Sequence, residues 1–135
     1  MDHEVVSREL IRALRGKRSQ TAFSRHLGYR CNVLYTWESG RRWPTAATFF
    51  RVAQRTQVDL ETKLPLFLGS KPDWLKARCL EEPKNVAALL GELRGNLTTV
   101  ELAKRTGAHR VSESRWLNAQ AEPKLPEFLR LVDAS

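Results

Sequence analysis

The sequence predicts an all-α protein, and three observations support this prediction. Apolar residues recur at helical spacing along the 135-residue chain, and no stretch alternates apolar and polar residues as a half-buried strand does. Residue types that begin helices, such as Ser and Thr, precede several of these stretches, and Gly follows several of them. The second half of the chain also repeats the pattern of the first half.

The first half is expected to hold five helices. Val6, Leu10 and Leu14 recur every four residues on a first helix that ends at Gly16. A second helix is expected at about 20–27, between Ser19 as its cap and Gly28, and a third at about 31–38, before Gly40. A fourth follows Pro44, with Thr45 as its cap and with Phe49, Phe50 and Val52 on the helix. A fifth, short helix limited by Pro65 is expected around Leu60, Leu64, Phe67 and Leu68.

An internal repeat relates the two halves. Residues 14–53 align without a gap with residues 93–132, a shift of 79 positions. Eight aligned pairs are identical: Leu14/Leu93, Arg15/Arg94, Gly16/Gly95, Gly28/Gly107, Trp37/Trp116, Pro44/Pro123, Phe49/Phe128 and Arg51/Arg130. A period this long exceeds the roughly 20 to 50 residues of solenoid repeats, so the pattern indicates a duplicated domain.

The segment between the copies, residues 69–82, is expected to be a helical linker. Ser70 can cap a helix that begins near Pro72, and Trp74, Leu75 and Leu80 would dock it between the two halves. The alternative is a peptide or ligand site around Trp74.

Charge and composition limit the function classes. The formal net charge is +8, and the isoelectric point is near 10.1. Nucleic acid is the leading explanation, because Lys and Arg side chains bind phosphates by displacing condensed counterions. A basic but merely solvated surface is the alternative. No apolar run reaches the roughly 20 residues of a membrane span, and the first ten residues do not resemble a signal peptide.

No enzyme or metal site is expected. Cys31 and Cys79 are the two cysteines, and no Cys/His cluster has zinc-ligand spacing. Paired carboxylates, a nucleophile beside a base and a phosphate-cradling Gly-rich loop are also missing from the sequence. We therefore expect a cytoplasmic, nucleoid-associated protein without cofactor, metal or membrane contact, and no small-molecule substrate is evident.

A specific motif lies in the first half. Ser19-Gln20, Phe23-Ser24, Leu27-Gly28, Leu34, Trp37-Glu38 and Gly40 match, at unbroken spacing, the pattern of the lambda-repressor-like (XRE or Cro type) helix-turn-helix family. The resemblance covers residues 5–68 well and residues 85–133 more weakly. It implies two tandem lambda-repressor-like helix-turn-helix bundles: an N-terminal DNA-binding domain at 1–68, the helical linker at 69–82 and a second, diverged domain at 83–135. It also implies a bacterial or phage source.

The resemblance implies a sequence-specific, double-stranded DNA-binding transcriptional regulator whose recognition helices enter the major groove. In the first copy, Arg30 would bind guanine, Asn32 adenine and Thr36 the thymine methyl group. A solvated helix start is the alternative for Arg30 and Asn32. The DNA-binding positions carried over are Gln20, which would meet a phosphate; Arg30, Cys31, Asn32 and Thr36, at base edges; Tyr35, beside them; and Arg41 and Arg42, near the backbone. Glu38 belongs to the motif, but its acidity indicates a structural role.

The second copy has diverged. Its matching DNA-binding positions are Thr99, His109, Arg110, Ser112 and Arg115, and Thr98 with Glu101 forms a capping box. Thr106 and Glu113 replace Leu27 and Leu34, while Leu117 and Ala119 replace Glu38 and Gly40. Residues 1–64 carry 12 basic and 6 acidic residues, against 11 and 9 in residues 65–135.

The alternative function is an antitoxin-like module, in which the first copy alone binds DNA and the second binds a protein partner or forms a homodimer.

Overall fold

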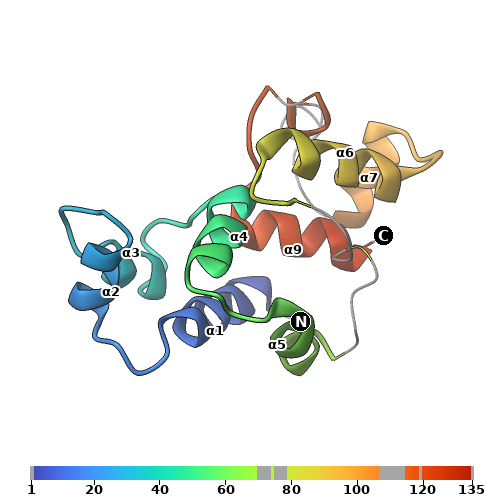
Figure 1. Ribbon diagram of the computed structural model, residues 1–135. Coiled ribbons are helices and arrows are strands. Elements are labelled where there is room, and N and C mark those ends of the chain that lie inside the picture. The colour runs from blue at the N-terminus through green and yellow to red at the C-terminus, as the bar shows by residue number, and fades with distance from the viewer. Residues whose placement is uncertain (1, 70–73, 75–78, 107–114, 119, 135) are drawn as a thin grey trace.

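The computed structural model describes residues 2–69, 74, 79–106, 115–118 and 120–134. These residues form helices, turns and loops, as the all-α prediction requires, with one isolated bridge between Thr45 and Lys124. The helices, shown in Figure 1, are α1 (His3–Arg15), α2 (Gln20–His26), α3 (Val33–Glu38), α4 (Ala46–Arg55), α5 (Leu60–Leu68), α6 (Pro83–Arg94), α7 (Thr99–Thr106) and α9 (Leu125–Ala134). Within the described ranges, no helix is long and apolar enough to cross a membrane.

Polar caps and positive-φ glycines set the helix ends of the first half. The Ser19 side chain accepts the Ala22 N–H at the start of α2, and the Thr45 side chain accepts the Thr48 N–H at the start of α4. Gly16 follows α1 with φ 61°, where a residue with a Cβ is strained. These three boundaries agree with the sequence prediction.

Two boundaries differ from the prediction. Helix α3 begins at Val33 rather than at residue 31, because Asn32 lies just before it with a non-helical ψ of 75° and caps it. Helix α5 is not limited by Pro65. It continues through this residue to Leu68 and ends at Gly69, whose φ is 81°. Pro65 therefore removes one N–H donor inside the helix without ending it.

The 79-residue repeat of the sequence recurs in the helix boundaries. Helices α4 and α9 occupy residues 46–55 and 125–134, which correspond at both ends. Helices α1 and α6 end at the equivalent residues Arg15 and Arg94, and the glycines that follow have nearly the same φ, 61° and 57°. Helices α2 and α7 begin at the equivalent positions 20 and 99.

The starts of α4 and α9 meet through two reciprocal hydrogen bonds. The Ala46 N–H donates to the Pro123 carbonyl at 2.9 Å, and the Leu125 N–H donates to the Pro44 carbonyl at 2.9 Å. A shift of 79 residues converts each bond into the other. A local pseudo-twofold axis between the two halves of the chain therefore relates the two bonds.

The two halves share one hydrophobic core. Helix α1 packs against α9, and its counterpart α6 packs against α4, so each first helix contacts the opposite half (Figure 1). Trp74 lies between the halves: its ring meets Phe50 at 6.3 Å and Phe128 at 5.4 Å between centroids, edge to face in both cases. Leu80 is fully buried in the same core. Trp74 and Leu80 thus have the docking role predicted for them, whereas Ser70 and Leu75 lie outside the described residues.

Candidate nucleic-acid interface

A tight turn joins α2 to α3. Gly28 has φ 93°, which lets the chain reverse after Leu27. The Tyr29 ring then packs edge-on against Trp37, with 5.7 Å between centroids. From α4, the Arg55 Nη1 donates to the Leu27 carbonyl at 3.3 Å and so satisfies the end of α2. The turn is held from both sides, by an aromatic pair and by a side-chain cap.

The buried Ser24 links the two short helices. Its hydroxyl donates to the Gln20 carbonyl at 2.8 Å and accepts the Leu34 N–H at 3.2 Å. Phe23 and Leu34, which are 1% and 0% exposed, fill the space between the helices. Apolar burial and one polar link together fix the angle of α3 on α2.

Asn32 is engaged within this unit. Its Oδ1 accepts the Tyr35 N–H at 3.2 Å and lies 3.3 Å from the Ser24 hydroxyl, while its Nδ2 donates to Thr21 Oγ1 at 3.4 Å. The side chain assigned to adenine from the sequence thus caps α3. The roles of Thr21 and of the cap were not predicted, although Asn directly before a helix is a favoured N-cap.

The outward residues of α3 and its flanks form the candidate interface. Arg30, Cys31, Tyr35, Arg41 and Arg42 are exposed, whereas Gln20 and Thr36 are half-buried. The Arg41 guanidinium lies 5.8 Å from the centre of the Tyr35 ring, so the ring holds this cation beside the helix. Tyr35 is 49% exposed, which leaves much of the ring open to a partner.

Glu38 has the structural role that its acidity indicates. It is 6% exposed, and Arg15 donates to it through Nε at 2.8 Å and through Nη2 at 2.9 Å. Arg12 Nε adds a third bond at 3.3 Å. These bonds tie the end of α3 to α1 and neutralise the carboxylate, and the sequence did not reveal the two arginines.

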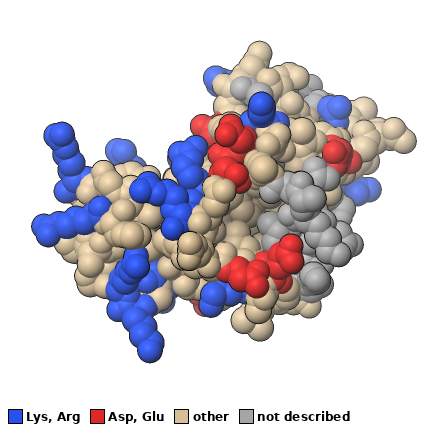
Figure 2. All heavy atoms as spheres, in the orientation of Figure 1, with Lys and Arg blue, Asp and Glu red and all other residues tan. Residues whose placement is uncertain are grey.

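The electrostatics of residues 17–43 are one-sided. Glu38 is the single carboxylate in this stretch, and it is buried and paired. The same stretch of sequence contains six Lys and Arg residues, all exposed: Lys17, Arg18, Arg25, Arg30, Arg41 and Arg42. In the view of Figure 2, Lys and Arg side chains project from the end formed by α2 and α3, whereas Asp and Glu side chains gather over the middle. Such a surface attracts a polyanion.

The equivalent stretch of the second half, residues 96–122, is less basic, with four Lys or Arg and three Glu. Arg115 is exposed, and Thr99 is the first residue of α7. The Thr98 Oγ1 accepts the Glu101 N–H at 3.1 Å, which is one of the two bonds of the predicted capping box. The candidate residues His109, Arg110 and Ser112, and the replacement Glu113, lie outside the described residues.

Among the described residues, no three His, Cys, Asp or Glu side chains gather as metal ligands would. Searches against protein-family models, curated proteins and solved structures found no match.

Proposed function

We propose that the chain is a sequence-specific transcriptional regulator that binds double-stranded DNA through a helix-turn-helix formed by α2 and α3. The observation that carries the proposal is the surface of residues 17–43, where all six Lys and Arg are exposed and the single carboxylate is buried. A phosphate backbone meets only positive charge there, which favours a polyanion over a basic or neutral partner.

The proposal assigns different tasks to the residues of α3 and its flanks. Arg30, exposed before the helix, can donate to the two acceptors of a guanine. Asn32 sets the start of the helix, because its Oδ1 accepts the Tyr35 N–H and its Nδ2 donates to Thr21 Oγ1. Arg41, held on Tyr35, and Arg42 follow the helix and contact phosphates.

The internal pseudo-twofold relation supports two helix-turn-helix units in one chain. The reciprocal bonds of Ala46 and Leu125 relate the halves as the subunits of a dimer are related. Dimeric regulators whose subunits are related by a twofold axis bind inverted half-sites, which lie about one turn of the DNA helix, ~34 to 36 Å, apart. In the proposal, one chain therefore occupies a pseudo-palindromic site, with the first half making the stronger contacts.

The test is selection of bound sequences from a random duplex pool by the full chain, followed by affinity measurements. Arg30→Gln is expected to weaken the selected site by ~5- to 150-fold, matching about 1 to 3 kcal/mol, and to relax one base position. Lys84→Gln removes an exposed charge on α6, outside the candidate interface, and should leave affinity for the selected site unchanged.

Enrichment of two inverted half-sites would support both units, and one short site would limit base recognition to the first. Binding without enrichment would reject sequence specificity. No binding at low salt would reject the proposal and also the antitoxin-like alternative, in which the first copy binds DNA.

A further inference from the structure

Helix α3, on which the candidate interface depends, has six residues, Val33–Glu38. Isolated helices shorter than ~12 to 15 residues are marginally stable in water, so a helix this short depends on contacts with the rest of the chain. Its first turn leaves N–H groups without partners inside the helix. Two side chains accept them: Ser24 Oγ accepts the Leu34 N–H at 3.2 Å, and Asn32 Oδ1 accepts the Tyr35 N–H at 3.2 Å.

Ser24 differs from Asn32 because it caps α3 from another helix. It lies on α2, ten residues before Leu34, and is 1% exposed. Its hydroxyl donates to the Gln20 carbonyl at 2.8 Å, which leaves the oxygen as the acceptor for the Leu34 N–H. Asn32 moves with α3, whereas Ser24 connects the first turn of α3 to α2. Ser24 therefore restrains where α3 begins relative to α2.

The sequence of the second half cannot form this cap at the equivalent position. A shift of 79 residues places Ala103 at the position of Ser24, and the Ala side chain neither donates nor accepts a hydrogen bond. Other residues whose side chains hold α3 or its cap by hydrogen bonds are replaced in the same way. The replacements, none of which has a polar side chain, are Gly91 for Arg12, Val100 for Thr21, Val111 for Asn32 and Leu117 for Glu38.

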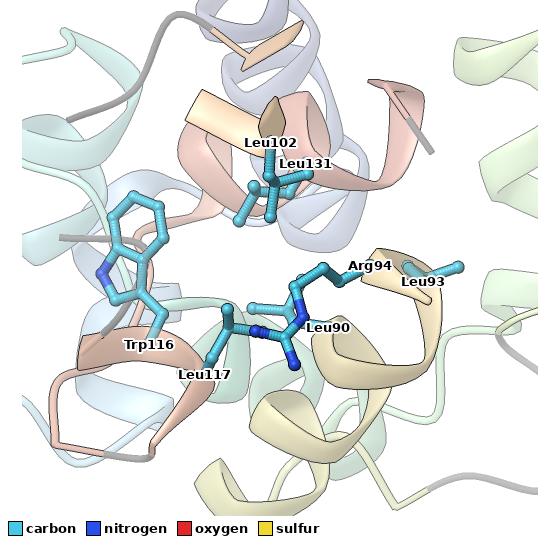
Figure 3. Close-up of a pocket in the computed structure, with 7 residues that line it drawn as sticks. All are labelled: Leu90, Leu93, Arg94, Leu102, Trp116, Leu117 and Leu131. Atoms are coloured by element: carbon cyan, nitrogen blue, oxygen red, sulfur yellow. The ribbon is translucent and has the colours of Figure 1, made fainter. Parts of the chain in front are cut away.

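The second half keeps the apolar packing of the unit. Trp116 is buried, as its equivalent is in the first half. Arg94 is kept at the position of Arg15, and Figure 3 shows its guanidinium beside Leu117, the residue equivalent to Glu38. Apolar burial is not directional, whereas a hydrogen bond is. The equivalent positions therefore supply packing without the directional side-chain links of the first half.

We infer that Ser24 is a positioning residue for base recognition by α3, and that Ala103 at the equivalent position makes the second half the weaker reader of bases. The inference rests on the proposed function and names a residue that makes its two half-sites unequal. Side chains that contact base edges must be held within ~0.5 Å of the productive geometry. The attraction of Lys or Arg to a phosphate falls only gradually with distance, so it depends less on Ser24.

The test compares Ser24→Ala with Ser7→Ala in the full chain. Ser7 is a matched control, because it is 0% exposed and its hydroxyl donates to the carbonyl four residues earlier, that of His3, at 2.6 Å on α1. Both variants lose a buried hydroxyl and a bond of this kind. Ser24→Ala also removes the acceptor of the Leu34 N–H.

Ser24→Ala should weaken binding to the selected duplex by ~3- to 10-fold, because α3 is correctly placed in a smaller fraction of the molecules. Binding to random duplex should weaken by less than about twofold, since phosphate contacts carry no sequence information. Ser7→Ala should leave the ratio of the two affinities unchanged. Without DNA, hydrogen exchange of the Leu34 amide should become faster in Ser24→Ala and stay unchanged in Ser7→Ala.

Ser24→Cys is the conservative variant. It keeps a weak donor and acceptor in a similar volume, so it should retain the fold and an affinity ratio between those of the wild type and Ser24→Ala. Circular dichroism establishes that each variant is folded under the binding conditions.

The selected sequences give a second readout. In the wild type, the half-site whose base preference Arg30→Gln relaxes should show the stronger base preferences. Selection by Ser24→Ala should weaken the preferences of that half-site and make the two halves of the site more alike.

A wild-type chain that selects no sequence would reject the proposed function, and this inference with it. A wild-type chain that selects a site, with an affinity ratio that Ser24→Ala leaves unchanged or that Ser7→Ala lowers equally, would overturn the inference alone. Stronger base preferences in the half-site that Arg30→Gln does not affect would also overturn it.

Discussion

Arg15 and Glu38 lie 23 residues apart in the sequence, yet the Arg15 Nε lies 2.8 Å from the Glu38 Oε2 in the structure. The pair connects α1 to the last turn of α3, the short helix on which the candidate interface depends. It also removes the single carboxylate of residues 17–43 from the surface. One buried contact thus holds α3 against α1 and also leaves the surface around α3 positively charged.

Glu38→Gln should lower the free energy of unfolding by ~2 to 4 kcal/mol. Breaking a buried ion pair leaves an uncompensated charge, and the estimate is reduced because the Arg12 side chain is 61% exposed. Urea unfolding followed by circular dichroism measures the change. Glu9→Gln, at an exposed position of α1, is the matched control and should alter stability by less than about 0.5 kcal/mol. A similarly small effect of Glu38→Gln would contradict the structural role.

Substitutions of Asn32 separate capping from base recognition. Asn32→Ala should lower the free energy of unfolding by ~1 kcal/mol, because the Tyr35 N–H loses its acceptor. Asn32→Ser should restore most of that stability, since Ser is an equally good N-cap. If Asn32 acts only as a cap, the Ser variant also retains affinity for the selected DNA. Loss of affinity at normal stability would instead assign adenine recognition to Asn32.

Arg41→Gln should weaken binding to selected and random duplexes by the same factor. A phosphate contact carries no sequence information, and its loss should reduce the slope of log affinity against log salt by about 0.9. Fluorescence anisotropy at several salt concentrations measures both effects. A change confined to the selected duplex would show that Arg41 contacts a base.

Trp74→Ala should destabilise the whole molecule, because the ring contacts Phe50 in one half and Phe128 in the other. Trp74 is only half-buried, so the loss should be about 2 to 3 kcal/mol, below the roughly 3 to 5 of a fully buried Trp. Trp74→Phe keeps an aromatic ring and should lose less. Both halves should still unfold in one transition, because they share a core. Two separate transitions in urea would contradict this.

The sequence predicted the local features of the fold well, because short-range chemistry determines them. Ser19 and Thr45 cap helices as expected, and Leu10 and Leu14 are buried on α1. Pro65 was misjudged, because the rest of α5 tolerates the loss of one donor.

Features that depend on distant partners were not predictable in the same way. The acidity of Glu38 indicated a structural role, but the sequence could not show that Arg12 and Arg15 would bind it. The repeat was visible, but nothing in it indicated that each first helix would pack on the opposite half. The second role of Asn32 was missed because the expected helix began two residues too early.

The reciprocal bonds of Ala46 and Leu125 have a further consequence. A homodimer built on such an axis has two identical ends, so it lies equally well either way round on a symmetric partner. In this molecule the two ends are encoded separately, and they differ at Glu38 and Leu117 and in their charge. The two ends of the molecule are therefore not equivalent. A chain bound to an otherwise symmetric partner can give that partner an upstream and a downstream side.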